Sequence, residues 1–300
     1  MLAALLCTAA LIGCGGDAAE PTTSAPDPRE PVPEASEAAA SRLADRFDED
    51  RAWKLLEYQV KIGPRPAGSP QLKQLATYIK NRIPRGRLEA VPGGLQNVVG
   101  EIPGKGKAIV VGAHYDTKDI PDFVGANDGA GGTAAVMEIA RVMRTMKRPA
   151  NARPIKFVFF DGEEATDDSD FLGTGVRGAK AYANKYAKST AKLILLDFVA
   201  DKDLAIPREQ TSDEEMWANL RAAAKRVGAL SAFPDEEQGG VQDDHTPFVQ
   251  KGIPSIDLID FDFPCWHQTC DDLTAVSKKS LNLSGEAVLE YVTTEWKSKA

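Results

Sequence analysis

The chain has 300 residues, of which 43% are hydrophobic and 27% are charged, and its formal net charge at pH 7 is −8. This length accommodates one large domain or two small ones. The acidic balance argues against a nucleic-acid-binding function, because nucleic-acid phosphates attract basic surfaces.

The N-terminal segment is expected to lie outside the folded domain. Residues 2–12 are apolar but too few to span a bilayer. The stretch Leu11-Ile12-Gly13-Cys14 resembles the lipobox of bacterial lipoproteins, in which cleavage precedes the cysteine and a lipid is attached to it. Residues 1–14 are therefore predicted to be a lipoprotein signal peptide with Cys14 as the lipobox cysteine. An ordinary secretory signal peptide is the alternative, and both interpretations predict export.

A linker is expected to follow the signal peptide. Residues 15–40 are rich in Pro, Ala, Ser, Thr and Glu, a composition that buries too little apolar surface to become ordered. We predict a disordered tether that holds a single catalytic domain, residues 41–300, away from the membrane at the cell surface or in the periplasm.

Helical and strand-like segments alternate through the predicted domain. Strands are expected at residues 97–102, 108–113, 155–160, 193–198 and 253–259, and helices at 42–60, 70–83, 131–146, 176–188, 213–227 and 280–297. The first two strands are predicted to pair as a hairpin across the turn at 103–107. Ser69 is expected to cap the second helix, with Pro70 at its first position. The alternation predicts a three-layer αβα domain with a mostly parallel central sheet.

One stretch joins a buried strand to a pair of carboxylates. Residues 157–165 read Phe-Val-Phe-Phe-Asp-Gly-Glu-Glu-Ala. Ligands of open α/β sheets bind beyond the carboxyl ends of the strands, where Glu163 and Glu164 are expected. Neighbouring side chains point in different directions, so one can bind a metal while the other stays free as a base. A solvated acidic loop is the alternative for this stretch alone.

Other side chains that can bind metal also follow strands. His114 and Asp116 end the second predicted strand, Asp128 follows it, and His267 follows the last one. Each of the three histidines, the third being His245, lies after a strand-like run or in an acidic cluster. Histidines and carboxylates at several strand ends are how a zinc site is assembled in an α/β protein.

Several polar residues have simpler interpretations. Asp116 is expected to orient His114 rather than to bind metal, and His245 is expected to be structural. Asp161 is expected to cap a turn. The acidic run at 167–170 is interpreted as a solvated loop, with a position near the pocket rim where it binds a cation as the alternative. Three tryptophans at helical spacing are expected in the core or on the surface: Trp53, Trp217 and Trp296.

Two cysteines flank His267 at a spacing of five residues, Cys265 and Cys270. In an oxidising compartment this arrangement favours a disulfide. Two free thiols are one alternative. A metal-binding thiolate pair is the other, although the spacing differs from the two-residue gap of zinc ribbons.

The motifs occur in the order found in one superfamily of zinc enzymes. They are His114-Tyr115-Asp116, Gly125-Ala126-Asn127-Asp128, Asp161-Gly162-Glu163-Glu164-Ala165, Asp243-Asp244-His245 and Trp266-His267. On these residues the chain resembles the glutaminyl-peptide cyclotransferases of bacterial and animal type and the related zinc aminopeptidases of the M28-type peptidase fold. The resemblance covers about residues 63–272 and implies a zinc exopeptidase-like fold.

The resemblance implies a metal site. Asp128, Glu164 and His267 would be the ligands of one zinc ion. Two carboxylates and an imidazole leave an open position on tetrahedral zinc, as a Lewis acid requires. His114 and Asp197 match the positions that hold a second zinc in the aminopeptidases. We expect one zinc, with two as the alternative.

The resemblance also implies catalytic and substrate-binding residues. Glu163 would be the general acid/base, with its pKa raised by burial. Asp197 and Asp243 match carboxylates that share a hydrogen-bond network in the cyclases. Trp266 and Gln242 would line the substrate pocket.

Three functions are compatible with these residues. A cyclotransferase converts N-terminal glutamine of a peptide or protein into pyroglutamate and releases ammonia. A two-zinc aminopeptidase hydrolyses the N-terminal residue, with Glu163 activating a bridging water. A non-enzymatic binding lipoprotein is the third. The doubled aspartate before His245 and Trp266 before His267 favour the cyclase, which we expect to be a monomer.

The chain departs from the cyclases at two places. The cyclases carry a second pocket tryptophan soon after Glu-Glu-Ala, and residues 166–172 contain none. The segment between His267 and the pair Asp271-Asp272 is one residue longer.

Overall fold

The structure is a computed structural model that describes residues 45–297. The predicted signal peptide with Cys14 and the predicted tether lie outside the described residues. Within residues 45–297, no helix has the length and apolar character needed to cross a membrane.

A six-stranded sheet in the order β1-β2-β4-β3-β5-β8 forms the centre of the domain. Its strands are β1 (Arg87–Val91), β2 (Leu95–Ile102), β3 (Ala108–His114), β4 (Ile155–Phe160), β5 (Thr190–Leu196) and β8 (Ser255–Leu258). The four strands β4, β3, β5 and β8 run parallel, whereas β2 is antiparallel to both of its neighbours. Two short strands, β6 (Arg208–Glu209) and β7 (Glu237–Gln238), pair separately.

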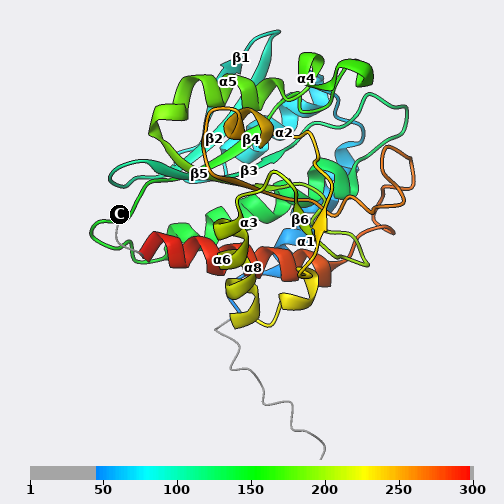
Figure 1. The fold of residues 1–300 in the computed structure, drawn as a ribbon. Helices are drawn as coiled ribbons and strands as arrows, with labels where there is room; N and C mark the ends of the chain where they lie inside the picture. Colours follow the sequence, from blue (N-terminus) through cyan, green and yellow to red (C-terminus); the bar gives the residue numbers. More distant parts are fainter. Residues whose placement is uncertain (1–44, 298–300) are drawn as a thin grey trace, which may run out of the picture. The chain divides into compact units, whose positions relative to one another are not determined.

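Helices cover both faces of this sheet (Figure 1). They are α1 (Glu49–Ile62), α2 (Pro70–Lys80), α3 (Gly132–Thr145), α4 (Phe171–Thr174), α5 (Arg177–Tyr186), α6 (Glu214–Arg226), α7 (Thr246–Val249) and α8 (Lys278–Lys297). One face packs on α1, α2, α3, α6 and α8, and the other on α5 and α7. The predicted three-layer αβα fold with a mostly parallel sheet is therefore confirmed.

Strand β4 shows why both faces need cover. Phe157 and Phe159 belong to the core on the α3 side, and Val158 and Phe160 to the core on the α5 side. All four side chains are fully buried. Because successive side chains of a strand point to opposite faces, a strand covered on both sides is a continuous apolar run. The large core beside α6 and α8 also buries Trp217 and Trp296, and Trp53 packs against it.

The predicted hairpin between residues 97–102 and 108–113 is wrong. Both segments are strands, but β4 lies between them and pairs with each, antiparallel to β2 and parallel to β3. Strands on either side of a third lie about 10 Å apart, a distance that a five-residue connection spans. The connection therefore passes over the start of β4, where the Lys105 N–H donates to the Ala152 carbonyl. Strand β1 is an edge strand that was not predicted, because its charged side chains interrupt the apolar alternation.

Helix starts follow the capping residues. Helix α1 begins at Glu49 rather than at residue 42, because the Asp48 side chain accepts a hydrogen bond from the Arg51 N–H and caps it. Ser69 caps α2 and Pro70 occupies its first position, as predicted. The other predicted helices and strands are present, with ends that differ by a few residues.

Candidate metal and substrate site

The strand ends that were predicted to carry chemistry meet at one edge of the sheet. His114 is the last residue of β3, Glu163 and Glu164 follow β4, Asp197 follows β5, and the loop with His267 follows β8. These four strands are parallel neighbours, so their carboxyl ends lie on the same edge. The sheet thus brings together side chains from His114 to His267, which are 153 positions apart in the sequence.

Asp128, Glu164 and His267 form a group with spacing suited to a metal ion. His267 Nε2 lies 3.4 Å from Glu164 Oε2 and 3.7 Å from Asp128 Oδ2. Two donors on a tetrahedral ion such as zinc, each about 2.0–2.1 Å from it, are about 3.3 Å apart. Asp128 Oδ2 and Glu164 Oε1 are buried without a hydrogen-bond partner among the described residues, which is costly unless a cation lies between them. The residues present therefore fit a metal ion.

A second group consists of His114, Asp128 and Asp197 and shares Asp128 with the first. His114 Nε2 lies 3.0 Å from Asp197 Oδ1 and 3.2 Å from Asp128 Oδ1. The two oxygens of Asp128 thus face different histidines. Burial of His114 disfavours its charged form, but the adjacent carboxylates, Asp197 first, outweigh burial and raise the imidazole pKa well above its usual value. Here the separations have hydrogen-bond lengths, so His114 and Asp197 bind each other directly.

Asp116 lies beneath the turn that carries the two glutamates. Its Oδ1 accepts a hydrogen bond from the Glu163 N–H at 3.2 Å, and its Oδ2 accepts one from the Glu164 N–H at 3.3 Å. Asp116 Oδ1 also lies 3.7 Å from His114 Nδ1. Asp116 therefore contacts the turn and His114 and belongs to neither metal group, as expected for an orienting residue.

Glu163 is a buried carboxylate that lines the cavity and lies outside both metal groups. Burial raises its pKa well above the usual range, and the neighbouring Glu164 raises it further, whereas His114 lowers it. Burial also raises the pKa of Asp197 to about 8, against the effect of His114. A carboxyl group with a raised pKa can both accept and donate a proton near neutral pH.

A cavity of about 620 Å³ opens onto these groups. Trp266 lines it, is 45% exposed, and packs with its ring centroid 4.7 Å from His267 and 5.1 Å from Phe261. Gln242 and Asp243 also line the cavity, as predicted for pocket residues. The structure thus brings all the predicted site residues together, while their roles in chemistry stay predictions.

Some residues that line the cavity were not predicted from the sequence. Phe171 and Phe261 are part of its wall, and no local motif marks either of them. Phe171 comes from the segment in which the cyclases carry their second tryptophan. Asp168 also lines the cavity, so the acidic run lies at the rim, the alternative interpretation, and not only in solvent. Lys118 binds Asp168 there and donates to the Ala165 carbonyl at 3.0 Å.

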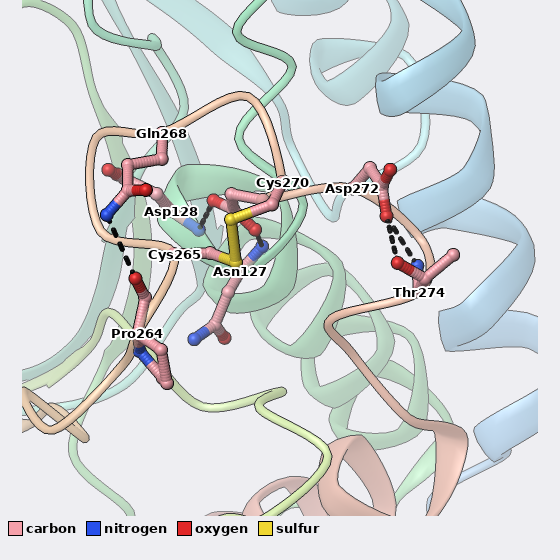
Figure 2. Close-up of a disulfide and its surroundings, with 9 residues drawn as sticks. Asn127, Asp128, Pro264, Cys265, Gln268, Cys270, Asp272 and Thr274 are labelled. Carbon is pink, nitrogen blue, oxygen red and sulfur yellow. Dashed lines mark hydrogen bonds between the residues drawn. A yellow bond between two sulfur atoms is a disulfide. The ribbon is translucent and has the colours of Figure 1, made fainter.

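The loop that carries Trp266 and His267 is closed by a disulfide. Cys265 and Cys270 are bonded, as predicted (Figure 2). Both residues lie between these cysteines in the sequence. His267 has a φ of 52°, a left-handed conformation that is rare for a residue other than glycine. Such a conformation persists only where the surroundings enforce it. Gln268 contributes by donating from Nε2 to the Pro264 carbonyl at 3.0 Å.

Asp271 connects this loop to the turn that carries Asp128. Its two carboxylate oxygens accept hydrogen bonds from the N–H groups of Asn127 at 2.7 Å and Asp128 at 3.0 Å. The disulfide lies beside this turn in Figure 2. Gly129 follows with a φ of 89°, and a Cβ there would lie 2.7 Å from the Asp116 carbonyl oxygen, so the turn requires glycine.

His245 lies behind Asp243 in a buried polar cluster. Its Nε2 is 2.9 Å from Thr211 Oγ1, and its Nδ1 is 3.3 Å from Asp257 Oδ2. Glu209 also contacts it, and although burial opposes ionisation, His245 and nearby N–H groups lower the Glu209 pKa to about 2. Asp243, His245 and Asp257 have a spacing that could hold a metal, but neither His245 nor Asp257 lines the cavity. This position agrees with the predicted structural role of His245.

Comparison with known proteins identifies the family. Residues 97–292 match the model of peptidase family M28. The chain belongs to this family. Its M28 region contains both metal groups and the cavity. The predicted zinc exopeptidase-like fold is thereby confirmed.

Proteins similar to this chain include glutaminyl-peptide cyclotransferases and an aminopeptidase. The glutaminyl-peptide cyclotransferase of Bos taurus is 28% identical over 201 residues, which is 55% of this chain and 55% of that protein. Aminopeptidase YwaD of Bacillus subtilis (strain 168) is 29% identical over 210 residues, 64% of this chain and 42% of that protein. The chain spans between 55% and 62% of the length of the first three curated relatives it matches.

A solved structure is also similar along most of the chain. The crystal structure of Acidobacteriales bacterium glutaminyl cyclase superposes with a TM-score of 0.72 and 29% identity. The similarity covers 91% of this chain and 99% of the other. The fold is therefore shared over nearly the whole of both chains.

The geometry predicts which side chains retain the metal. Glu164→Gln and His267→Ala each remove one of three donors, and the remaining two hold a divalent ion poorly. We expect the metal content of each variant to fall to less than about a tenth of the wild-type content, as measured by elemental analysis after gel filtration. Asp262→Asn is the control, because Asp262 lines the cavity outside both metal groups. Full metal content in both ligand variants would refute this ligand set.

The disulfide is predicted to affect the metal site more than the overall stability. In Cys265→Ser/Cys270→Ser the loop is free to relax His267 out of its left-handed conformation, and we expect metal affinity to fall about tenfold. The melting temperature should change little, because closing so short a loop constrains the unfolded chain only slightly. Wild-type protein treated with a phosphine reductant should match the double variant. Unchanged affinity in both samples would contradict the prediction.

Proposed function

We propose that this member of family M28 is a zinc-dependent glutaminyl-peptide cyclotransferase. It acts on N-terminal glutamine of peptides or proteins, forms pyroglutamate and releases ammonia. The observation that carries the proposal is the difference between the two metal groups. His267 stands 3.4 and 3.7 Å from the nearest oxygens of Glu164 and Asp128, whereas His114 and Asp197 are in direct contact at 3.0 Å. A single metal site suits cyclisation, which requires no nucleophilic water. The cyclases among the relatives and solved structures support the same choice.

One zinc ion would be held by Asp128, Glu164 and His267. When bound there, zinc supplies Lewis-acid polarisation of the substrate amide carbonyl at its open coordination position. Two anionic oxygens and an imidazole nitrogen are a donor set that zinc accepts. The buried, unpartnered oxygens of Asp128 and Glu164 support this assignment.

Proton transfer falls to Glu163. The substrate α-amine nitrogen forms a bond to the side-chain amide carbon, and the bond from this carbon to the amide nitrogen breaks. Glu163 takes the proton from the attacking amine and delivers it to the leaving nitrogen, so ammonia departs and Glu163 returns to its first state. A pKa raised by burial suits a group that accepts and donates in one turnover. Asp197 and Asp243 face the same cavity and can hold the α-amine by hydrogen bonds.

The cavity wall would hold the glutamine side chain. Trp266 offers a flat, half-exposed ring beside His267, against which a planar amide can pack. Gln242 lines the same cavity and can hydrogen-bond to the amide or to the peptide backbone. A volume of about 620 Å³ exceeds what one side chain fills, so residues that follow the glutamine also fit.

We also infer the cellular location and state of the protein. The Leu-Ile-Gly-Cys stretch ending at Cys14 supports export, lipid attachment and anchoring to a membrane at the cell surface or in the periplasm. The disulfide between Cys265 and Cys270 supports an oxidising compartment. The tether, residues 15–40, would separate the catalytic domain from the membrane. We expect the enzyme to act as a monomer.

An aminopeptidase is the second candidate, and the position of Asp128 favours it. Its two oxygens face His267 and His114, which is how a carboxylate bridges two metal ions. In two-metal sites the ions lie about 3.5–4 Å apart, a distance that one carboxylate spans. The second ion would require His114 and Asp197 to exchange their direct contact for a shared metal.

Replacement of the proton carrier is the first test of the mechanism. Glu163→Gln keeps the shape of the side chain but removes its capacity to carry a proton. We expect ammonia release from a glutamine-initiated peptide to fall by about 10²–10⁴-fold, the usual contribution of a positioned acid/base. Zinc content and melting temperature should stay at wild-type values, which separates lost chemistry from lost folding. Wild-type turnover in this variant would place the proton carrier elsewhere, with Asp243 the next residue to replace.

A second test separates the cyclase from the peptidase. Wild-type protein should contain about one zinc per chain, release ammonia from glutamine-initiated peptides, and leave leucine- and alanine-initiated peptides intact. His114→Ala should keep this zinc content and lose only part of the activity. Trp266→Ala should impair turnover of glutamine substrates strongly. Two tightly bound zinc ions, one of them lost in His114→Ala together with cleavage of leucine- or alanine-initiated peptides, would identify the protein as an aminopeptidase.

A further inference from the structure

Arg65 is a fully buried arginine in the connection between α1 and α2. Its guanidinium binds backbone carbonyls from two separate segments of the chain. Nη1 donates to the carbonyls of Gln59 at 3.0 Å, Gly63 at 3.0 Å and Val124 at 2.9 Å, and Nη2 donates to that of Gly125 at 3.4 Å. The guanidinium therefore joins the end of α1 to the backbone just before the turn that carries Asp128.

This cation has no direct salt bridge to any described carboxylate. Burying a guanidinium is costly unless negative charge or hydrogen bonds compensate. The carboxylates whose attraction acts most strongly on Arg65 are Asp271, Asp128 and Asp116. Although burial lowers the pKa of Arg65 to about 10, the side chain is still positively charged at neutral pH. Arg65 is thus a buried positive charge whose donors reach the Gly125 carbonyl, two residues before the Asn127 N–H that binds Asp271.

Asp116 and Asp271 each accept hydrogen bonds from two consecutive N–H groups of a turn. Asp116 accepts hydrogen bonds from the consecutive N–H groups of Glu163 and Glu164, and Asp271 accepts them from those of Asn127 and Asp128. Each carboxylate fixes a turn that bears a metal ligand. A buried anion of this kind is stabilised by a cation at short range.

Arg65 is also tied by its backbone to the segment that follows Asp116. The Arg65 N–H donates to Thr117 Oγ1 at 2.9 Å, and the Thr117 N–H donates to the Arg65 carbonyl at 3.2 Å. The backbone of Arg65 therefore binds Thr117, the residue after Asp116. Its side chain binds the backbone of Val124 and Gly125, just before the turn that carries Asp128.

We propose that Arg65 is a positioning residue of the metal site, whose buried charge compensates Asp116 and Asp271 and whose donors fix the backbone ahead of Asp128. The proposal rests on the metal site of the proposed function but not on the reaction. Arg65 touches neither the metal ligands' donor atoms nor the cavity, so its effect is on metal affinity through the two turns.

Zinc affinity of the metal-free protein, measured by competition with a chelating dye and no substrate, tests the proposal. Arg65→Met removes both the charge and the donors, and we expect about a 100-fold loss of affinity. Arg65→Lys keeps the charge but cannot bind all the carbonyls, and the expected loss is about tenfold. Arg221→Met is the matched control. Arg221 also donates to a backbone carbonyl, that of Phe233 at 3.0 Å, but lies in α6 outside the site.

A double-variant cycle distinguishes positioning from a general loss of packing. Asp271→Asn removes a charge that Arg65 compensates, so once Arg65→Met is present, Asp271→Asn should cost less affinity than it does in the wild-type protein. We expect the combined loss to be at least about tenfold smaller than the product of the two single losses. Wild-type affinity in Arg65→Met, or a combined loss equal to that product, would overturn the proposal.

The experiment remains decisive if a variant folds poorly. Circular dichroism and melting of the metal-free proteins are recorded first. If Arg65→Met is unfolded at the assay temperature, the same cycle is measured with Arg65→Lys. In that cycle the charge is retained, so Asp271→Asn should cost the same as in the wild-type protein, and a smaller cost would overturn the charge assignment. Absence of cyclase activity in the wild-type protein would count against the reaction alone, because zinc affinity is measured without substrate.

Discussion

The carboxylates buried at the carboxyl edge of the sheet need positive charge or hydrogen bonds to stabilise them, and the rest of the site depends on this requirement. Transfer of an ion out of water costs several kcal/mol unless opposite charge or hydrogen bonds replace the water. Burial raises the pKa of Glu163, Asp244 and Asp257 well above the usual range, so these groups are only partly compensated by the protein. A divalent cation bound between the unpartnered oxygens of Asp128 and Glu164 would supply the missing positive charge. The acidic site and the metal are therefore one electrostatic unit.

The groups that compensate this charge also determine the geometry. Asp116 and Asp271 are stabilised by backbone N–H groups, and those same hydrogen bonds fix the turns that carry the ligands. Each of these two turns is consequently held by a carboxylate from another loop. The disulfide adds a covalent constraint around His267, which keeps a left-handed conformation. Because the loops depend on one another, a change far from the cavity can alter metal binding without touching a ligand.

The sequence was informative where local patterns determine the structure. The apolar run before Glu163 predicts a strand covered on both faces, and β4 is such a strand. The ligand candidates were predictable because parallel strands end at one edge and place metal-binding side chains there. Pairing of β2 with β4 was not predictable, since a five-residue connection fits either a hairpin or a step over one strand. Phe171 and Arg65 carry no local signal, because the contacts that bring each of them to the site are with segments distant in sequence.

The choice between one and two metal ions follows from a small difference in the same set of residues. Asp128 presents one oxygen to His267 and the other to His114, so it can serve either a single site or a bridged pair. What differs is the contact between His114 and Asp197. At 3.0 Å it is a hydrogen bond that joins the two groups directly, and opening it by a few tenths of an ångström would create room for donors around a second ion. The candidate ligands in this chain are the same residues whether one ion or two would be bound. The residues that set this spacing, among them Asp116 with Oδ1 3.7 Å from His114 Nδ1, therefore bear on the number of metal ions as directly as the candidate ligands do.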